Sequence, residues 1–259
     1  MSALGAPARR AARTPAGVVA LIAAAWALAI AAEVSGSARR LHHDALIEGG
    51  PALPLAIVLF LVAWQAMVAA MMLPSSLPLV RLFAVAASGQ RRRYAAVGGL
   101  VAGYALAWSL FGLAAFLFDV GVHRAVDASA WISAHAVLLG PLTLALAGAY
   151  QFTPLKDACL RSCRHPSQFL VRHYRRGVPA ALGLGLRHGA FCVGCCWALM
   201  FVMFAAGVAN LVWMGVLTAV MVHEKTRPLG RRAVPVTGAA LLGLASILGA
   251  YVVAAEGWL

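Results

Sequence analysis

The sequence predicts an all-α protein: a polytopic membrane bundle of about seven transmembrane helices, with the N-terminus in the cytoplasm and the C-terminus outside (N-in/C-out). The first observation is composition, because 63% of the 259 residues are hydrophobic and only 11% are charged. Such values are typical of membrane proteins. The second is a series of apolar runs that approach the roughly 20 residues needed to cross a bilayer. We therefore predict one integral membrane domain, residues 16–255, after a cytoplasmic tail, residues 1–15.

Seven apolar segments are the predicted spans. The first follows three arginines and is similar to a signal peptide, but its apolar run exceeds the roughly 7–15 residues of a typical signal core, so we expect a retained helix. The second precedes Pro74, which we expect to end or kink it. Only "GVAN" separates the fifth span from the sixth, which predicts a tight antiparallel hairpin. The spans are approximately residues 16–34, 52–73, 95–118, 132–151, 186–206, 208–223 and 234–255.

The distribution of Lys and Arg sets the predicted orientation. Of these 21 residues, 18 fall in segments that this topology places in the cytoplasm, and only Arg39, Arg40 and Arg124 fall outside. The formal net charge of +13 is therefore mainly an orientation signal, as the positive-inside rule describes. A basic chain could also bind nucleic acid, but no recognition fold accompanies the charge. We predict the lipid bilayer as a partner and no nucleic acid.

A polar segment between the fourth and fifth spans predicts one more helix. Thr153 can cap a helix whose first position is Pro154. This helix should cover about residues 154–164 and stop before Pro166. Its Lys and Arg residues indicate an amphipathic helix at the cytoplasmic membrane surface.

The fifth predicted span contains the stretch "HGAFCVGCCWALMFVM". At about 100° per residue, His188, Cys192, Cys195, Cys196 and Met203 occupy roughly 100° of one helix face. The predicted orientation puts the His–Cys end of this stripe in the cytoplasmic half, where thiols stay reduced. A lone Cys or Met in such a helix is usually a packing residue. Three closely spaced cysteines instead favour a metal or redox role.

Further soft ligands are predicted at the same depth. Met67 and Met71 are four residues apart and share a face near the end of the second span, with Met72 adjacent. Cys159 and Cys163 share a face of the amphipathic helix. The sixth span ends with "MVHEK". Four chain regions thus bring sulfur, nitrogen or carboxylate groups to the cytoplasmic side.

The chemistry of these groups indicates the metal. Thiolate and thioether sulfur are soft donors that select Cu(I), whereas thiolate and imidazole also suit zinc. The methionines make copper, as Cu(I), the predicted metal and zinc the less favoured one. Mg²⁺ or Ca²⁺ would need more carboxylates than Asp157 and Glu224, and we interpret Glu224 as an interfacial charge. His42, His43 and His123 fall in outer segments, and we interpret them as surface residues.

The stretches "MVAAMMLPSSLPL", "GAYQFTPLKDACLRSCRHP", "GLGLRHGAFCVGCCWALM" and "NLVWM", with a following "EK", resemble a bacterial family of predicted metal-binding integral membrane proteins. It is a domain-of-unknown-function family, some members of which are described as copper chaperones. The resemblance covers roughly residues 50–226. It implies a multi-pass protein of a bacterial inner (plasma) membrane and a soluble metal-binding partner. The metal-binding residues that it implies are Met71 and Met72 before Pro74, Cys159 and Cys163, and Cys192, Cys195 and Cys196.

Three functions remain open. The first is Cu(I) handling, as a chaperone, by transfer to a cuproenzyme or by transport, through a Cys/His/Met site at the cytoplasmic side. The second is a membrane thiol-disulfide oxidoreductase that uses Cys192 and Cys195, although its thiols would face the reducing side. The third is a non-catalytic accessory membrane subunit. No nucleotide-binding, zinc-protease or serine-nucleophile motif occurs in a credible context, so we do not expect an enzyme.

Overall fold

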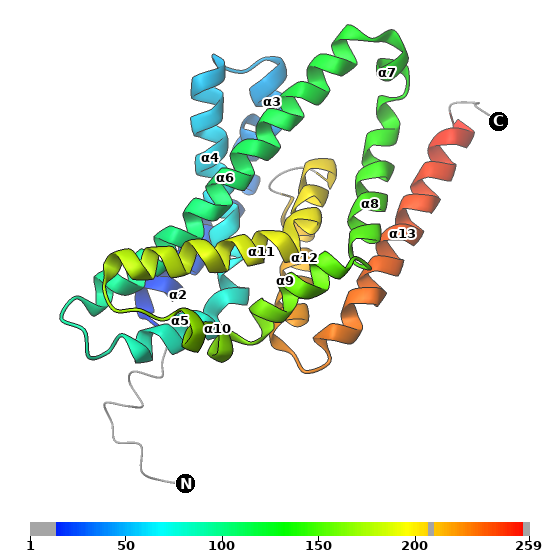
Figure 1. Ribbon diagram of the computed structural model, residues 1–259. Helices are drawn as coiled ribbons and strands as arrows, with labels where there is room; N and C mark the ends of the chain where they lie inside the picture. The colour runs from blue at the N-terminus through cyan, green and yellow to red at the C-terminus, as the bar shows by residue number, and fades with distance from the viewer. Residues whose placement is uncertain (1–13, 207–209, 256–259) are drawn as a thin grey trace.

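The computed structural model describes residues 14–206 and 210–255, and the regular elements in these residues are helices (Figure 1). The predicted tail at 1–15 lies almost entirely outside the described residues, as does most of the predicted "GVAN" hairpin turn. The elements are α2 Ala16–Val34, η1 Ser37–Leu41, α3 His43–Glu48, α4 Leu53–Met71, α5 Leu73–Ala86, α6 Arg93–Ala128, α7 Ala130–Ala134, η2 Ala136–Leu138, α8 Leu139–Tyr150, α9 Pro154–Arg164, α10 Pro166–His173, α11 Val178–Ala206, α12 Leu211–Thr226 and α13 Gly230–Ala255.

Five of the described helices are long and apolar enough to cross a membrane: α2, α4, α6, α11 and α13. The fourth predicted span corresponds mainly to η2 and α8. This segment, Ala136–Tyr150, is long and apolar enough only if it is taken together with α9, and the two are bent by 66° relative to each other. The sixth predicted span forms α12, whose 16 residues reach only about 24 Å, short of the about 30 Å of a bilayer core. The described residues therefore give an all-α fold with five candidate spans, or six if the bent pair is one span.

Several predicted spans differ in length from the helices observed: the fifth and seventh begin earlier than predicted, at Val178 and Gly230, and the second and third differ more clearly. The second breaks at Met72, which ends α4 and begins α5, and Pro74 occupies the first turn of α5. The break expected at this proline is therefore present. The third is much longer than residues 95–118, because α6 has 36 residues and extends about 54 Å. Its last turns carry the polar side chains Asp119, His123, Arg124 and Asp127.

The centre of the fold is the crossing of α6 and α11, which pack closely against each other (Figure 1). Gly103 of α6 and Gly185 of α11 make this approach possible. A Cβ on Gly103 would collide with the Leu182 backbone, and one on Gly185 would collide with the Leu100 backbone. Small residues at a membrane-helix crossing commonly have this role. The crossing brings Tyr104 of α6 to the cysteine-bearing face of α11.

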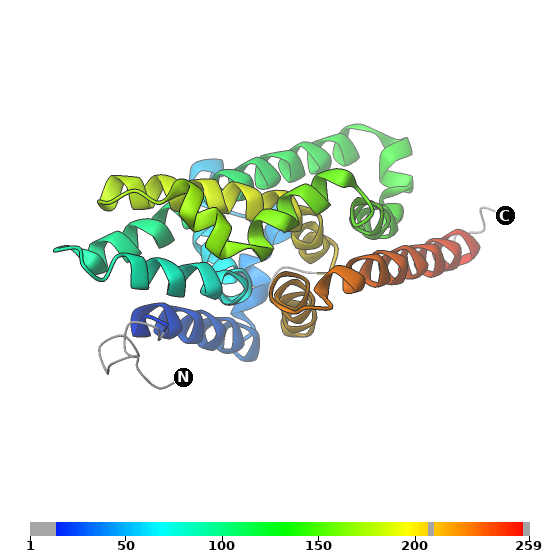
Figure 2. The same ribbon diagram turned by 60° about the horizontal axis from the view of Figure 1, so that its bottom comes forward.

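Helix α9 has the bounds that the sequence predicts. The Thr153 side chain accepts a hydrogen bond from the Lys156 backbone N–H at 3.3 Å and so caps the helix. Leu160 and Cys163 are buried, because α9 packs against both α11 and α12. Figure 2 shows α2 along one edge of the bundle and α13 projecting on another side. The cysteine face of α11 lies in the interior between these outer helices.

Candidate metal centre

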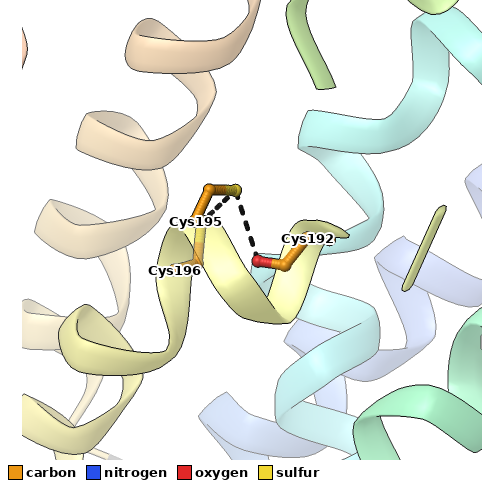
Figure 3. Close-up of side chains that lie close together, drawn as sticks. All are labelled: Cys192, Cys195 and Cys196. Atoms are coloured by element: carbon orange, nitrogen blue, oxygen red, sulfur yellow. Dashed lines mark hydrogen bonds between the residues drawn. The ribbon is translucent and has the colours of Figure 1, made fainter. Parts of the chain in front are cut away.

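Three cysteines of α11 lie close together, and the Cys195 sulfur is directed at Cys192 and Cys196 (Figure 3). Cys192, Cys195 and Cys196 are at most 1% exposed, and their sulfur atoms all lie within 4.8 Å of one another. The Cys195 and Cys196 sulfurs are 3.4 Å apart, and the Cys195 thiol donates to the Cys192 carbonyl oxygen at 3.3 Å. The spacing i, i+3, i+4 puts all three on one helix face. This convergence agrees with the stripe predicted from the sequence.

A fourth thiol reaches the cluster from α9. The Cys163 sulfur lies 3.8 Å from the Cys195 sulfur and is buried. Cys159, one turn earlier, is only half-buried and packs on the α11 backbone, where a Cβ on Gly194 would lie 2.6 Å from its sulfur. We call Cys163, Cys192, Cys195 and Cys196 the thiol cluster, with Cys159 at its margin.

Sequence reasoning missed two polar groups that hold the thiol cluster. The Lys225 ammonium at the end of α12 donates to the Cys192 sulfur at 3.0 Å and to the Ser75 hydroxyl at 3.1 Å. The Tyr104 hydroxyl lies 2.9 Å from the same sulfur. In the sequence Lys225 was counted among the cytoplasmic loop residues that set the orientation, but its side chain is only 5% exposed. An ammonium and a hydroxyl directed at one sulfur stabilise it as a thiolate.

Glu224 is not the interfacial charge that the sequence suggested. Its carboxylate forms an ion pair with the Lys156 ammonium at 2.8 Å, and both side chains are at most 1% exposed. Lys156 also donates to the Gln151 side chain. A pair this well buried is retained only where each charge has its partner. It fixes α9 to α12 and thereby sets the position of Cys163 beside α11.

His188 lies next to the thiol cluster rather than inside it. Its Nε2 is 3.4 Å from the Ser76 hydroxyl, and its ring stacks on Tyr104 at 5.8 Å between centroids. It is not among the residues whose ligand atoms converge within 4.8 Å. Its Nδ1 is buried and has no hydrogen-bond partner among the described residues. The histidine therefore reaches the cluster through Tyr104, and its role as a ligand stays a prediction.

The predicted methionine ligands share one buried core with the thiol cluster. Met71, Met72 and Met203 are fully buried and Met67 is 4% exposed. The same core includes Met200, Met214 and Met221, so thioethers from α4, α11 and α12 share one core with the thiols. Packing alone explains this burial. Their role as ligands also stays a prediction.

The donor set of the thiol cluster suits a soft monovalent metal ion. Thiolates in apolar surroundings are costly unless their charge is compensated. Two thiolates that hold Cu(I) carry one net negative charge, and the adjacent Lys225 ammonium would neutralise it. The residues present therefore fit copper.

Comparison with known proteins agrees with this chemistry. A family model described as "PpoB2: Copper chaperone" matches residues 61–248, which contain all five cysteines, Tyr104 and Lys225. No curated protein and no solved structure matches the chain. The match covers well over half of the chain. The chain therefore belongs to the PpoB2 copper chaperone family.

Proposed function

We propose that the protein holds Cu(I) in the thiol cluster, within a multi-pass fold of a bacterial inner membrane, and hands it to a copper-receiving protein. The observation that carries this proposal is the contact of the Lys225 ammonium with Cys192 in a buried cluster of four cysteines. Buried cysteines that serve only packing need no cation beside them. A cation supports thiolates, and thiolate is the form that binds metal.

Copper is favoured over zinc by charge and by surroundings. Structural zinc takes four tetrahedral ligands, and four thiolates would leave a net charge that Lys225 alone does not cancel. Cu(I) accepts fewer sulfur ligands and tolerates the thioether-rich core. The proposed primary ligands are Cys192 and Cys195, with Cys163 and Cys196 as the sulfurs to which the ion can shift.

Transfer by ligand exchange follows from the partial exposure of one thiol. Cys159 is the least buried of the five cysteines and adjoins the cluster through Gly194. An arriving or departing Cu(I) can exchange one thiolate for another there without any change in oxidation state. We therefore assign Cys159 to exchange with a soluble metal-binding partner or a cuproenzyme. The protein acts on no substrate bond in this scheme and is not an enzyme.

Anaerobic Cu(I) titration of detergent-purified protein tests the proposal. Competition with the chromophoric chelator bicinchoninate should show about one tightly held Cu(I), and elemental mass spectrometry should find copper in excess of zinc. The Cys192→Ser/Cys195→Ser/Cys196→Ser variant should lose this binding. Cys159→Ser is the matched control, because it removes one thiol from the margin and should slow loading while keeping the equilibrium affinity. Full affinity in the triple variant would refute the proposal.

The same detergent-purified protein can be used to distinguish the copper chaperone function from that of a thiol-disulfide oxidoreductase. That function is favoured by the stabilised Cys192 sulfur and requires a Cys192–Cys195 disulfide that forms and opens reversibly in metal-free protein. A redox titration with this result, together with the absence of tight copper binding, would replace the chaperone function.

A further inference from the structure

A second group of metal-binding side chains lies away from the thiol cluster, where α3 meets α6. His42 and His43 precede and begin α3, Asp44 follows them, and Asp119 and His123 lie on the distal part of α6. The ligand atoms of His42, His43 and Asp44 all lie within 4.8 Å of one another. We expected His42, His43 and His123 at the surface. They instead lie close together around Asp44, and His43 is only 5% exposed.

Asp44 is the centre of this group. Its carboxylate lies 3.1 Å from His42 Nδ1, 3.0 Å from His43 Nδ1 and 3.2 Å from His123 Nε2. Ligand atoms bonded at about 2.0–2.1 Å to one tetrahedral ion are themselves separated by roughly 3.3 Å. The separations around Asp44 are therefore close to those of a shared coordination sphere.

Asp119 brings a second carboxylate to the group. The Asp119 carboxylate lies 2.7 Å from His43 Nδ1, the same nitrogen that lies 3.0 Å from Asp44, and Asp119 is 15% exposed. A metal ion bound at this Nδ1 would displace the proton that the two carboxylates share, and Asp119 would then lie beside the ion as a further oxygen ligand.

The two groups are physically separate, although one helix contacts both. Tyr104 touches the thiol cluster, and Asp119 is fifteen residues further along α6, or about 22 Å. Between them the bundle is filled by aromatic side chains, with Trp64 packed on Trp108 and Phe60 stacked on Phe116. His42, His43 and Asp44 also lie outside the residues that the copper chaperone family model matches.

We propose that His42, His43 and Asp44, with His123 as a fourth ligand, form a second metal site that takes Cu(II). Imidazole nitrogen and carboxylate oxygen are harder donors than thiolate, and among divalent first-row ions such sites bind Cu(II) most tightly. The predicted N-in orientation places this site on the outer side of the membrane, where oxidised copper occurs. The site goes beyond the proposed Cu(I) function and does not depend on it.

Electron paramagnetic resonance of the full-length protein in detergent, titrated with CuSO₄ in glycine buffer, tests the second site. We expect one tightly bound Cu(II) with a tetragonal spectrum and nitrogen hyperfine splitting. The Cys192→Ser/Cys195→Ser/Cys196→Ser variant should give the same spectrum, so this result is separate from the fate of the Cu(I) proposal. His42→Ala/His43→Ala should abolish the signal, and Asp119→Asn, which removes one carboxylate from the group, should weaken binding about tenfold or more. His135→Ala, which changes a histidine outside the group, is the matched control.

Asp44→Asn covers the case in which the double histidine variant fails to fold. Asp44 is 47% exposed, so the change should be tolerated, and it should still weaken Cu(II) binding at least about tenfold. Wild-type Cu(II) binding in either variant, or binding of ZnSO₄ with no Cu(II) signal, would overturn the proposal. The first result would reduce the group to an ion-pair contact between α3 and α6, and the second would make it a zinc site.

Discussion

The Lys225 ammonium donates a hydrogen bond to the Cys192 sulfur at 3.0 Å, joining the end of α12 to the middle of α11. Replacing Lys225 with Met should weaken Cu(I) binding about 10- to 100-fold, because a hydrogen bond to a charged group contributes about 1.5–3 kcal/mol. Lys225→Arg keeps the charge and should retain most of the affinity. Competition with bicinchoninate measures both variants. Arg227→Ala removes a nearby cation outside the cluster, and an equal loss there would contradict a specific role for Lys225.

The buried Lys156–Glu224 pair should be a large element of stability. Glu224→Leu leaves Lys156 buried without its counter-charge and should destabilise the fold by about 3–5 kcal/mol. The double variant Lys156→Met/Glu224→Leu removes both charges and should recover most of that loss. Denaturant or thermal unfolding in detergent measures each. A double variant as unstable as the single one would show that the pair is not the source of the effect.

The close crossing of α6 and α11 should tolerate no added methyl group at Gly185. A Cβ there would collide with the Leu100 backbone, so Gly185→Ala should cost about 1–3 kcal/mol or more and displace Cys192 from Tyr104. Gly183 lies two residues earlier on α11, where an added Cβ would meet no other atom within 4 Å. Gly183→Ala should therefore leave stability and Cu(I) affinity unchanged. Thermal unfolding and Cu(I) titration measure both variants, and equal effects of the two substitutions would contradict the observed packing.

The 3.8 Å separation of the Cys163 and Cys195 sulfurs predicts oxidative cross-linking between α9 and α11. Treatment of metal-free protein with diamide should join α9 to α11 through these residues, because a disulfide needs only a small approach from this distance. Peptide mapping by mass spectrometry identifies the linkage. Preloading with Cu(I) should protect both thiols. Linkage mainly through Cys159 would show that α9 sits differently on α11.

Periodicity in the sequence was sufficient to predict the cysteine face of α11, because i, i+3 and i+4 positions depend only on helix geometry. Thr153 and Pro154 likewise predicted the start of α9 from local chemistry. Lys225 and Tyr104 were not predictable, since they reach Cys192 from other helices, 33 and 88 residues away. His188 lies on the predicted face of α11, but its ring stacks on Tyr104. The direction of this ring depends on tertiary packing and could not be predicted from the sequence. The number of spans could not be predicted from composition, because composition does not show where a helix breaks or bends, as between α8 and α9.

The charge of the buried Lys225 also determines how the membrane potential acts on copper binding. With one thiolate beside this ammonium, the metal-free centre is neutral. When Cu(I) binds, a second thiol releases its proton, and the loaded centre is neutral again. Loading then exchanges one proton for one Cu(I), so the membrane potential does no net work on this step. The proton concentration beside the centre, rather than the voltage across the bilayer, would set how readily copper is taken up or released.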